Sequence, residues 1–139
     1  MTYRWLVLLV GCIITLGLMP VQAQESGEAY ITYEGDIWAW DGNSTERLTE
    51  WGFNGNPILS PDGSKIAYAS VSTEAVELAQ DPTQDGGYLV YGGTPANNIW
   101  IMETSNRDFY RIADQSNNFP TLRGAPVWSP LSDEIAWVE

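Results

Sequence analysis

Few residues of this 139-residue chain have the side chains that enzymes use for acid–base or nucleophilic chemistry. The sequence contains no histidine, and its one cysteine is Cys12. A Ser-His-Asp or Cys-His arrangement therefore cannot be built, and neither can a zinc site with histidine ligands. Carboxylates are plentiful among the 18 acidic residues, but sequence alone does not place two of them across a cleft as glycosidases require. We expect no catalytic residue, no cofactor and no enzymatic activity in this chain.

One segment has the composition of a calcium-binding loop. Residues 81–87 read DPTQDGG, in which Asp81 and Asp85 offer carboxylate oxygens. Their spacing differs from the D-x-[DN]-x-[DN]-G pattern of an EF-hand loop. We therefore interpret the segment as a solvated loop and expect no metal site.

A second kind of chemistry, recognition through aromatic rings and arginine, is indicated by the segments between the expected strands. Two of these segments, EWGFNGNP and DQSNNFPTLRGAP, combine such residues, and YLVY adds two tyrosines. Aromatic and arginine side chains anchor many protein interfaces. The candidates for partner binding are Trp51, Phe53, Tyr88, Tyr91, Phe119 and Arg123. The alternatives are that these side chains cap the edges of sheets, or that Trp51 and nearby aromatic rings stack on sugars.

The start of the chain, residues 1–23, has the pattern of a secretory signal peptide. Arg4 precedes an apolar run at 5–19, Pro20 ends that run, and VQA at 21–23 forms a cleavage site. The run is shorter than the roughly 20 residues of a membrane span. We therefore expect an exported protein, periplasmic or extracellular, with an uncleaved membrane anchor as the alternative.

The charge of the expected mature chain restricts its partners. Loss of residues 1–23 removes Arg4 and leaves five basic against 18 acidic residues, a net charge of −13. Cys12 is lost as well, so no disulfide is available. An acidic chain of this kind is repelled by nucleic acids and by anionic membrane surfaces. The remaining partner classes are proteins, peptides and neutral ligands.

Three sequence blocks recur in one order and at nearly one spacing. Ser-Pro at 60–61 recurs at 129–130, DIWAWD at 36–41 recurs as NIWIME at 98–103, and RLTE at 47–50 recurs as RIAD at 111–114. The offsets in numbering are 69, 62 and 64, in that order. Residues 72–96 have no counterpart in the first copy, and without them the longest offset falls to 44. That length is typical of one four-stranded propeller blade, about 40–45 residues.

Short runs rich in Ile, Val, Tyr and Trp, separated by turn signals such as Asp-Gly, predict antiparallel strands. We expect an all-β fold, a β-propeller of four-stranded antiparallel blades with about two and a half blades present. The first blade (29–50) would hold strands at 29–33, 36–41 and 46–50, the second (57–114) strands at 57–60, 65–71, 98–104 and 108–114, and the third would begin at 126–138. Within the insertion, residues 73–79 predict one or two helical turns and 88–91 a small strand.

The pattern P-x-x-S-P-D-G-x-x-I-A-Y-x-S at 57–70, followed by NIWIME and RIA, resembles the WD-like repeat of TolB-type periplasmic proteins. It is also similar to the propeller repeats of prolyl-oligopeptidase-type enzymes. The resemblance covers roughly residues 29–139 apart from the insertion, and it implies the fold rather than the activity. In the last copy Leu131-Ser132 replaces Asp62-Gly63, so the pattern supports the blade there but does not establish that its hairpin is tight.

Two and a half blades do not close a ring. We therefore expect the chain to be the N-terminal part of a longer propeller, with assembly of a short protein from several copies as the alternative. In a four-stranded blade the longer connections, including 72–96, emerge at one end of the sheets, where binding residues usually lie. The expected function is a non-catalytic scaffold that binds a protein or peptide. The alternatives are the propeller domain of a secreted peptidase whose catalytic domain is absent from this chain, a carbohydrate-binding propeller, and a structural assembly protein.

Overall fold

The computed structural model describes residues 27–81, 95–115 and 120–139. They contain nine strands and one helix: β1 (Ala29–Tyr33), β2 (Asp36–Trp40), β3 (Thr45–Arg47), β4 (Asn54–Leu59), β5 (Lys65–Val71), α1 (Thr73–Gln80), β6 (Asn97–Glu103), β7 (Phe109–Ala113), β8 (Val127–Trp128) and β9 (Ile135–Ala136). The expected all-β class is confirmed by these antiparallel sheets. The predicted signal peptide and the predicted strand at 88–91 lie outside the described residues.

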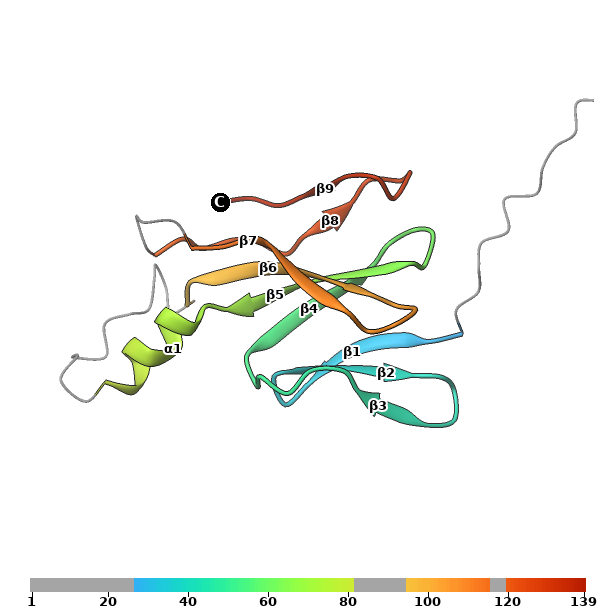
Figure 1. Cartoon of the computed structure of the whole chain (residues 1–139), viewed down its shortest axis with the longest axis horizontal. Coiled ribbons are helices and arrows are strands. Elements are labelled where there is room, and N and C mark those ends of the chain that lie inside the picture. The colour runs from blue at the N-terminus through green and yellow to red at the C-terminus, as the bar shows by residue number, and fades with distance from the viewer. Residues whose placement is uncertain (1–26, 82–94, 116–119) are drawn as a thin grey trace, which may run out of the picture.

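The strands pair in the order in which they occur along the chain. They form a three-stranded sheet β1-β2-β3, a four-stranded sheet β4-β5-β6-β7 and the pair β8-β9, all antiparallel. Figure 1 shows the four-stranded sheet between β1–β3 and β8–β9. Its first strand begins at Asn54 rather than at residue 57, because Asn54 and Gly55 pair with Ser70 and Ala69 of β5 before a bulge.

Apolar side chains on both faces of the four-stranded sheet join it to its two neighbours. On one face Ile66, Tyr68 and Met102 pack with Ile37 of the first sheet. On the opposite face a second cluster, Ala69, Ile99 and Ala113, packs with Trp137, which directly follows β9. We call the face toward the preceding sheet the back face and the face toward the following sheet the front face. Each front face therefore meets the back face of the next sheet.

The first two sheets repeat the same strand register. Trp38 and Trp100 are separated by the repeat offset of 62 and occupy the same position in their sheets. Each pairs with a β-branched or aromatic residue on one neighbouring strand and with an arginine on the other. Trp38 pairs with Ile31 and Arg47, and Trp100 pairs with Tyr68 and Arg111. The sequence repeat is thus a repeat of side-chain positions on the sheet faces.

The two Ser-Pro hairpin turns also have the same geometry. The Gly63 amide donates to the Ser60 carbonyl at 2.8 Å, and the Ser132 amide donates to the Ser129 carbonyl at 3.1 Å. Gly63 has φ +74° and Ser132 has φ +64°. The second turn is closed like the first although it lacks Asp-Gly, because Ser132 adopts the left-handed conformation that glycine supplies in the first copy. Its Oγ also accepts a hydrogen bond from the Asp62 amide at 3.0 Å, which holds the two turns side by side.

The two ends of the sheets differ in the length of their connections. The turns at 41–44, 60–64, 104–108 and 129–134 lie at one end, which we call the turn end (Figure 1). The connection end carries the segments at 48–53 and 120–126 and the helix α1 (Figure 1). This helix begins after Ser72, whose side chain accepts the Ala75 amide at 3.1 Å as an N-cap.

Candidate functional site

A buried carboxylate joins the first sheet to the second at the connection end. Asp36 begins β2 and is 1% exposed. Its Oδ1 accepts hydrogen bonds from the Thr49 hydroxyl at 2.8 Å and from the Gly52 amide and the Asn54 side chain at 3.0 Å each. Its Oδ2 accepts from Arg47 at 2.5 Å. One side chain therefore fixes β3, the 48–53 connection and the start of β4; we call this arrangement the first joint.

The electrostatics of the first joint favour the ionised form of Asp36. Burial alone would raise the pKa of this carboxyl group. Hydrogen bonds from the Gly52 amide, Arg47, Thr49 and Asn54 outweigh that effect and lower the pKa from 3.8 to about 2. The carboxylate is thus charged, fully bonded and structural at neutral pH, and it is not available as a general acid or base.

Two glycines let the backbone of the 48–53 connection approach the β1–β2 turn. Gly35 has φ +77°, and a Cβ atom placed on it would lie 2.0 Å from the Gly52 carbonyl oxygen. In addition, the Asn54 amide donates to the Gly35 carbonyl at 2.7 Å. Only glycine fits at position 35, for reasons of both conformation and space.

The first joint presents a pair of aromatic side chains to solvent. Trp51 and Phe53 are 42% and 43% exposed, and their rings meet edge to face with centroids 5.5 Å apart. The Trp51 indole donates to the Val71 carbonyl at 3.3 Å, and the Val71 amide donates to the Phe53 carbonyl at 2.9 Å. Because Asp36 and Val71 hold this segment from two sheets, the aromatic pair is exposed but fixed in position.

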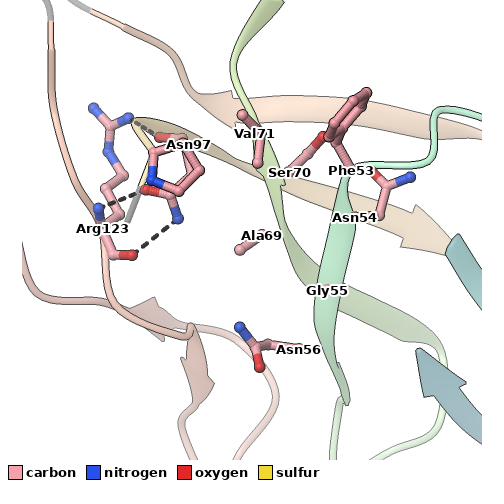
Figure 2. A pocket seen from close by; sticks show the side chains of 10 residues that line it. Phe53, Asn54, Gly55, Asn56, Ala69, Ser70, Val71, Asn97 and Arg123 are labelled. Carbon is pink, nitrogen blue, oxygen red and sulfur yellow. Dashed lines mark hydrogen bonds between the residues drawn. The ribbon is translucent and has the colours of Figure 1, made fainter. Parts of the chain in front are cut away.

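Two cavities adjoin this aromatic pair. The smaller, about 360 Å³, is lined by Phe53 and by polar side chains that include Asn56, Ser70 and Asn97. Figure 2 shows it between β4, β5 and the segment that carries Arg123. The larger, about 550 Å³, lies between the first and second sheets and includes Trp51 in its lining.

Four aromatic side chains contribute to the lining of the larger cavity. Trp100 and Phe109 meet edge to face with centroids 5.9 Å apart, and the Arg111 guanidinium lies 5.6 Å from the centre of the Trp100 ring. Tyr68 and Trp51 complete its aromatic lining. Its volume is in the range of small-molecule and side-chain pockets, about 300–1,000 Å³.

A second joint repeats the first between the second and third sheets. The Arg123 amide donates to the Asn97 side chain at 2.6 Å, and Asn97 returns a hydrogen bond to the Arg123 carbonyl at 2.9 Å. The guanidinium is buried and donates to Glu139, to the Asn97 carbonyl and to the Asp114 carbonyl at 2.7–2.8 Å. Arg123 lies 69 residues after Asn54, which is also the offset between the two Ser-Pro turns. Like Asn54, it binds a residue of the preceding sheet.

The structure thus separates the sequence-predicted binding residues into three groups. Trp51 and Phe53 lie together and are exposed. Arg123 reaches the same smaller cavity as Phe53, but its guanidinium is committed to intrachain acceptors, so we assign it to the second joint. Tyr88, Tyr91 and Phe119 lie outside the described residues.

The sequence alone did not predict partner binding by three residues of the larger cavity, Trp100, Phe109 and Arg111. The available signal was the repeat itself, since Trp100 and Arg111 occupy the positions of Trp38 and Arg47. Among the described residues no three acidic or sulfur-containing side chains gather as a metal site would require. No helix in the same part of the chain is both long and apolar enough to cross a membrane.

Comparisons with known proteins supply no relative: no family model, curated protein or solved structure matches the chain.

Proposed function

We propose that this chain is an exported, non-catalytic scaffold of the TolB-like propeller kind, which binds a peptide or a peptide segment of a protein at its connection end. Three features support the propeller assignment: the sheets follow chain order, they stack front to back, and the first two share one register. Each new sheet is joined to the preceding one by the same kind of joint. The pattern of residues 1–23 supports export.

The observation that carries the binding proposal is the fixed and exposed pair of Trp51 and Phe53. Exposed aromatic side chains that are already ordered lose little conformational entropy on binding, so their buried area is converted efficiently into affinity. The two cavities beside them provide space for partner side chains. The larger cavity suits an apolar or aromatic side chain, because Trp51, Tyr68, Trp100 and Phe109 line it.

A carbohydrate ligand is the second candidate, and one observation favours it. Phe53 borders the smaller cavity together with Asn56 and Ser70, whose side chains make no hydrogen bond within the described residues. An aromatic face beside free amide and hydroxyl groups is an arrangement that can hold a sugar ring. The peptidase alternative would require a catalytic domain in addition to these residues.

Selection from a displayed peptide library tests the proposal, with an array of oligosaccharides screened in parallel. A selected peptide should bind the double variant Trp51→Ala/Phe53→Ala at least about tenfold more weakly, because truncating an interface anchor costs more than about 1 kcal/mol. The matched control is Trp40→Ala/Tyr110→Ala, which removes two comparably exposed aromatic side chains from outside the connection end.

Three results would overturn the peptide proposal: no selected peptide, equal loss in both double variants, or an oligosaccharide as the only ligand sensitive to Trp51→Ala. The export component is tested separately. Peptides from residues 36–123 should be recovered from the cell envelope or the medium, and the mature N-terminus should be Gln24. Recovery in the cytoplasmic fraction alone would contradict it.

A further inference from the structure

A row of buried polar side chains forms part of the lining of the larger cavity. Asn54, Ser70 and Asn98 lie side by side on β4, β5 and β6, since Asn54 pairs with Ser70 and Ser70 pairs with Asn98. They are 7%, 5% and 4% exposed, and all three line the cavity. The cavity lies between two described sheets rather than on an outermost face of the stack. Because buried polar groups normally have hydrogen-bond partners, we examined the partners of this row.

Hydrogen bonds within the chain satisfy only part of the row. The Asn54 side-chain amide donates to two groups of the first joint. The Asn98 side-chain oxygen accepts a hydrogen bond from Gln115 at 3.1 Å. The Asn98 NH2 group and the Ser70 hydroxyl, by contrast, make no hydrogen bond within the described residues.

A third free group lies beside this row. Tyr68 precedes Ser70 by two residues, so both lie on the back face of β5, where Tyr68 is 3% exposed. The Tyr68 hydroxyl makes no hydrogen bond within the described residues, and burial alone raises its pKa. Among the described side-chain atoms, only Nη1 of Arg107 is fully enclosed without a partner. The free groups of Tyr68, Ser70 and Asn98 therefore reach the open space of the cavity that these residues line.

These three groups determine what a side chain in the cavity must offer. The Asn98 NH2 group needs an acceptor, whereas the two hydroxyl groups can donate or accept. A purely apolar occupant would exclude water from all three groups without replacing its hydrogen bonds, which is unfavourable. An ammonium or guanidinium group only donates, so it cannot satisfy Asn98. A hydroxyl group both donates and accepts, so it can satisfy Asn98 and Ser70 together.

The rings and charges of the lining restrict the occupant further. The aromatic side chains of the cavity offer surfaces against which another ring packs favourably. A carboxylate or phosphate is disfavoured, because Glu50 belongs to the lining and Arg111 is already paired with Asp114 at 2.6 Å. Tyrosine combines an aromatic ring with a neutral hydroxyl group. Tryptophan only donates a hydrogen bond, and phenylalanine neither donates nor accepts one.

We propose that the larger cavity receives a tyrosine side chain of the partner, whose hydroxyl accepts from Asn98 and donates to Ser70. These two residues are directly opposite each other on β5 and β6, so one hydroxyl can reach both. That the tyrosine belongs to a peptide rests on the proposed function, whereas the preference of the cavity for a phenol does not. Trp51 and Phe53 then anchor the partner at the surface, and the cavity selects the residue beside them.

Titration with p-cresol and with toluene, the side chains of tyrosine and phenylalanine, tests the cavity without a peptide. Nuclear magnetic resonance follows the side-chain amide of Asn98 and the indole of Trp100. p-Cresol should shift both signals and bind at least about tenfold more tightly than toluene, because a site that hydrogen-bonds a hydroxyl rejects the analogue without it. Ser70→Ala removes one of the hydrogen bonds and should reduce this preference by about threefold or more. The matched control Ser105→Ala removes an exposed hydroxyl at the turn end and should leave it unchanged.

Three results of this titration would overturn the proposal: equal binding of p-cresol and toluene, a preference that Ser70→Ala leaves unchanged, or binding that does not shift the Asn98 amide signal. So would tighter binding of p-cresol by Tyr88→Phe/Tyr91→Phe than by the wild type, because a tyrosine of this chain would then occupy the cavity.

Peptides selected to test the proposed function separate its failure from the failure of this inference. A peptide whose binding depends on Trp51 and Phe53 should lose affinity at least about tenfold when its tyrosine is replaced by phenylalanine. Binding that depends on the aromatic pair but tolerates phenylalanine would overturn the tyrosine proposal and leave the proposed function standing. A cavity that prefers p-cresol when no peptide is selected would support the tyrosine specificity and overturn only the peptide partner.

Discussion

Replacing Asp36 with asparagine removes the charge at the centre of the first joint and leaves its shape nearly unchanged. The folded-state pKa of this carboxyl group is about 2 against an ordinary value of 3.8, and this difference corresponds to about 2 kcal/mol of stability at neutral pH. Asparagine also provides one acceptor oxygen where the carboxylate provides two. Thr49, Gly52 and Asn54 all donate to Oδ1, which asparagine keeps, whereas Arg47 donates to the oxygen that becomes an amide NH2 group. Two donors then face each other, at a further cost of about 1 kcal/mol.

The expected total for Asp36→Asn is therefore a loss of about 2–4 kcal/mol in the free energy of unfolding at pH 7. This range lies about 1 kcal/mol lower than the cost of breaking a fully buried ion pair, about 3–5 kcal/mol, because the Arg47 side chain is 44% exposed and can be hydrated. Urea titration followed by tryptophan fluorescence measures it. Glu77→Gln is the control: Glu77 is exposed and makes no hydrogen bond or ion pair within the described residues.

The pH dependence provides an independent check on the same residue. Since the pKa of Asp36 is lowered by folding, its stabilisation is complete above pH 3.8 and is lost as the pH falls toward 2. Asp36→Asn should lose less stability over that interval than the wild type, by about 2 kcal/mol. The reasoning is refuted if Asp36→Asn and Glu77→Gln are equally stable at pH 7, or if the acid-induced loss is the same with and without Asp36.

Three further substitutions test other features of the fold. Gly35→Ala should lower the free energy of unfolding by about 2–4 kcal/mol, because its Cβ would collide with the Gly52 carbonyl. Gly42→Ala is also at positive φ but has open space around it, and should lower it by about 1 kcal/mol. Thermal unfolding compares the two variants, and equal effects would contradict the close approach at Gly35. Arg123→Gln should cost about 2–4 kcal/mol and expose the β8–β9 segment to limited proteolysis, while unchanged cleavage would rule out its role in the second joint. Burial raises the pKa of Tyr68 from 10.0 to about 12, so its stabilisation is lost as the pH rises from 10 toward 12, and Tyr68→Phe should abolish this part of the alkaline loss, as unfolding at about pH 9 and pH 11 would reveal.

The sheets were predictable from sequence because strand signals are local. Alternating apolar residues and Asp-Gly turns placed most strands within a few residues, and the helical turns expected at 73–79 form α1. The start of β4 was missed because Asn54 and Gly55 have low strand propensity. Asn54 is extended because Asp36 and Gly35 bind it, and Gly55 follows as it pairs with Ala69. The bonds to Asp36 and Gly35 are a tertiary effect that a local pattern does not contain.

The candidate site was predictable only in part. Trp51 and Phe53 were predicted as binding residues because they are aromatic and lie between two expected strands. The structure places both at the connection end, where they are exposed. Arg123 has the same favourable type but is buried, because residue type does not reveal whether intrachain acceptors already satisfy a guanidinium. Its position in the repeat is equivalent to that of Asn54. Once the first joint is known, this equivalence indicates that Arg123 binds the preceding sheet rather than a partner.

The short reach of the two joints has a consequence for how the chain folds. Asn54 binds Asp36, 18 residues earlier, and Arg123 binds Asn97, 26 residues earlier. Each sheet is therefore fastened to chain that has already been synthesised, and the latest partner of either joint is Glu139, 16 residues after Arg123. Contacts of such low sequence separation form quickly. The described sheets can therefore assemble one at a time, in chain order, while the following residues are still emerging from the ribosome.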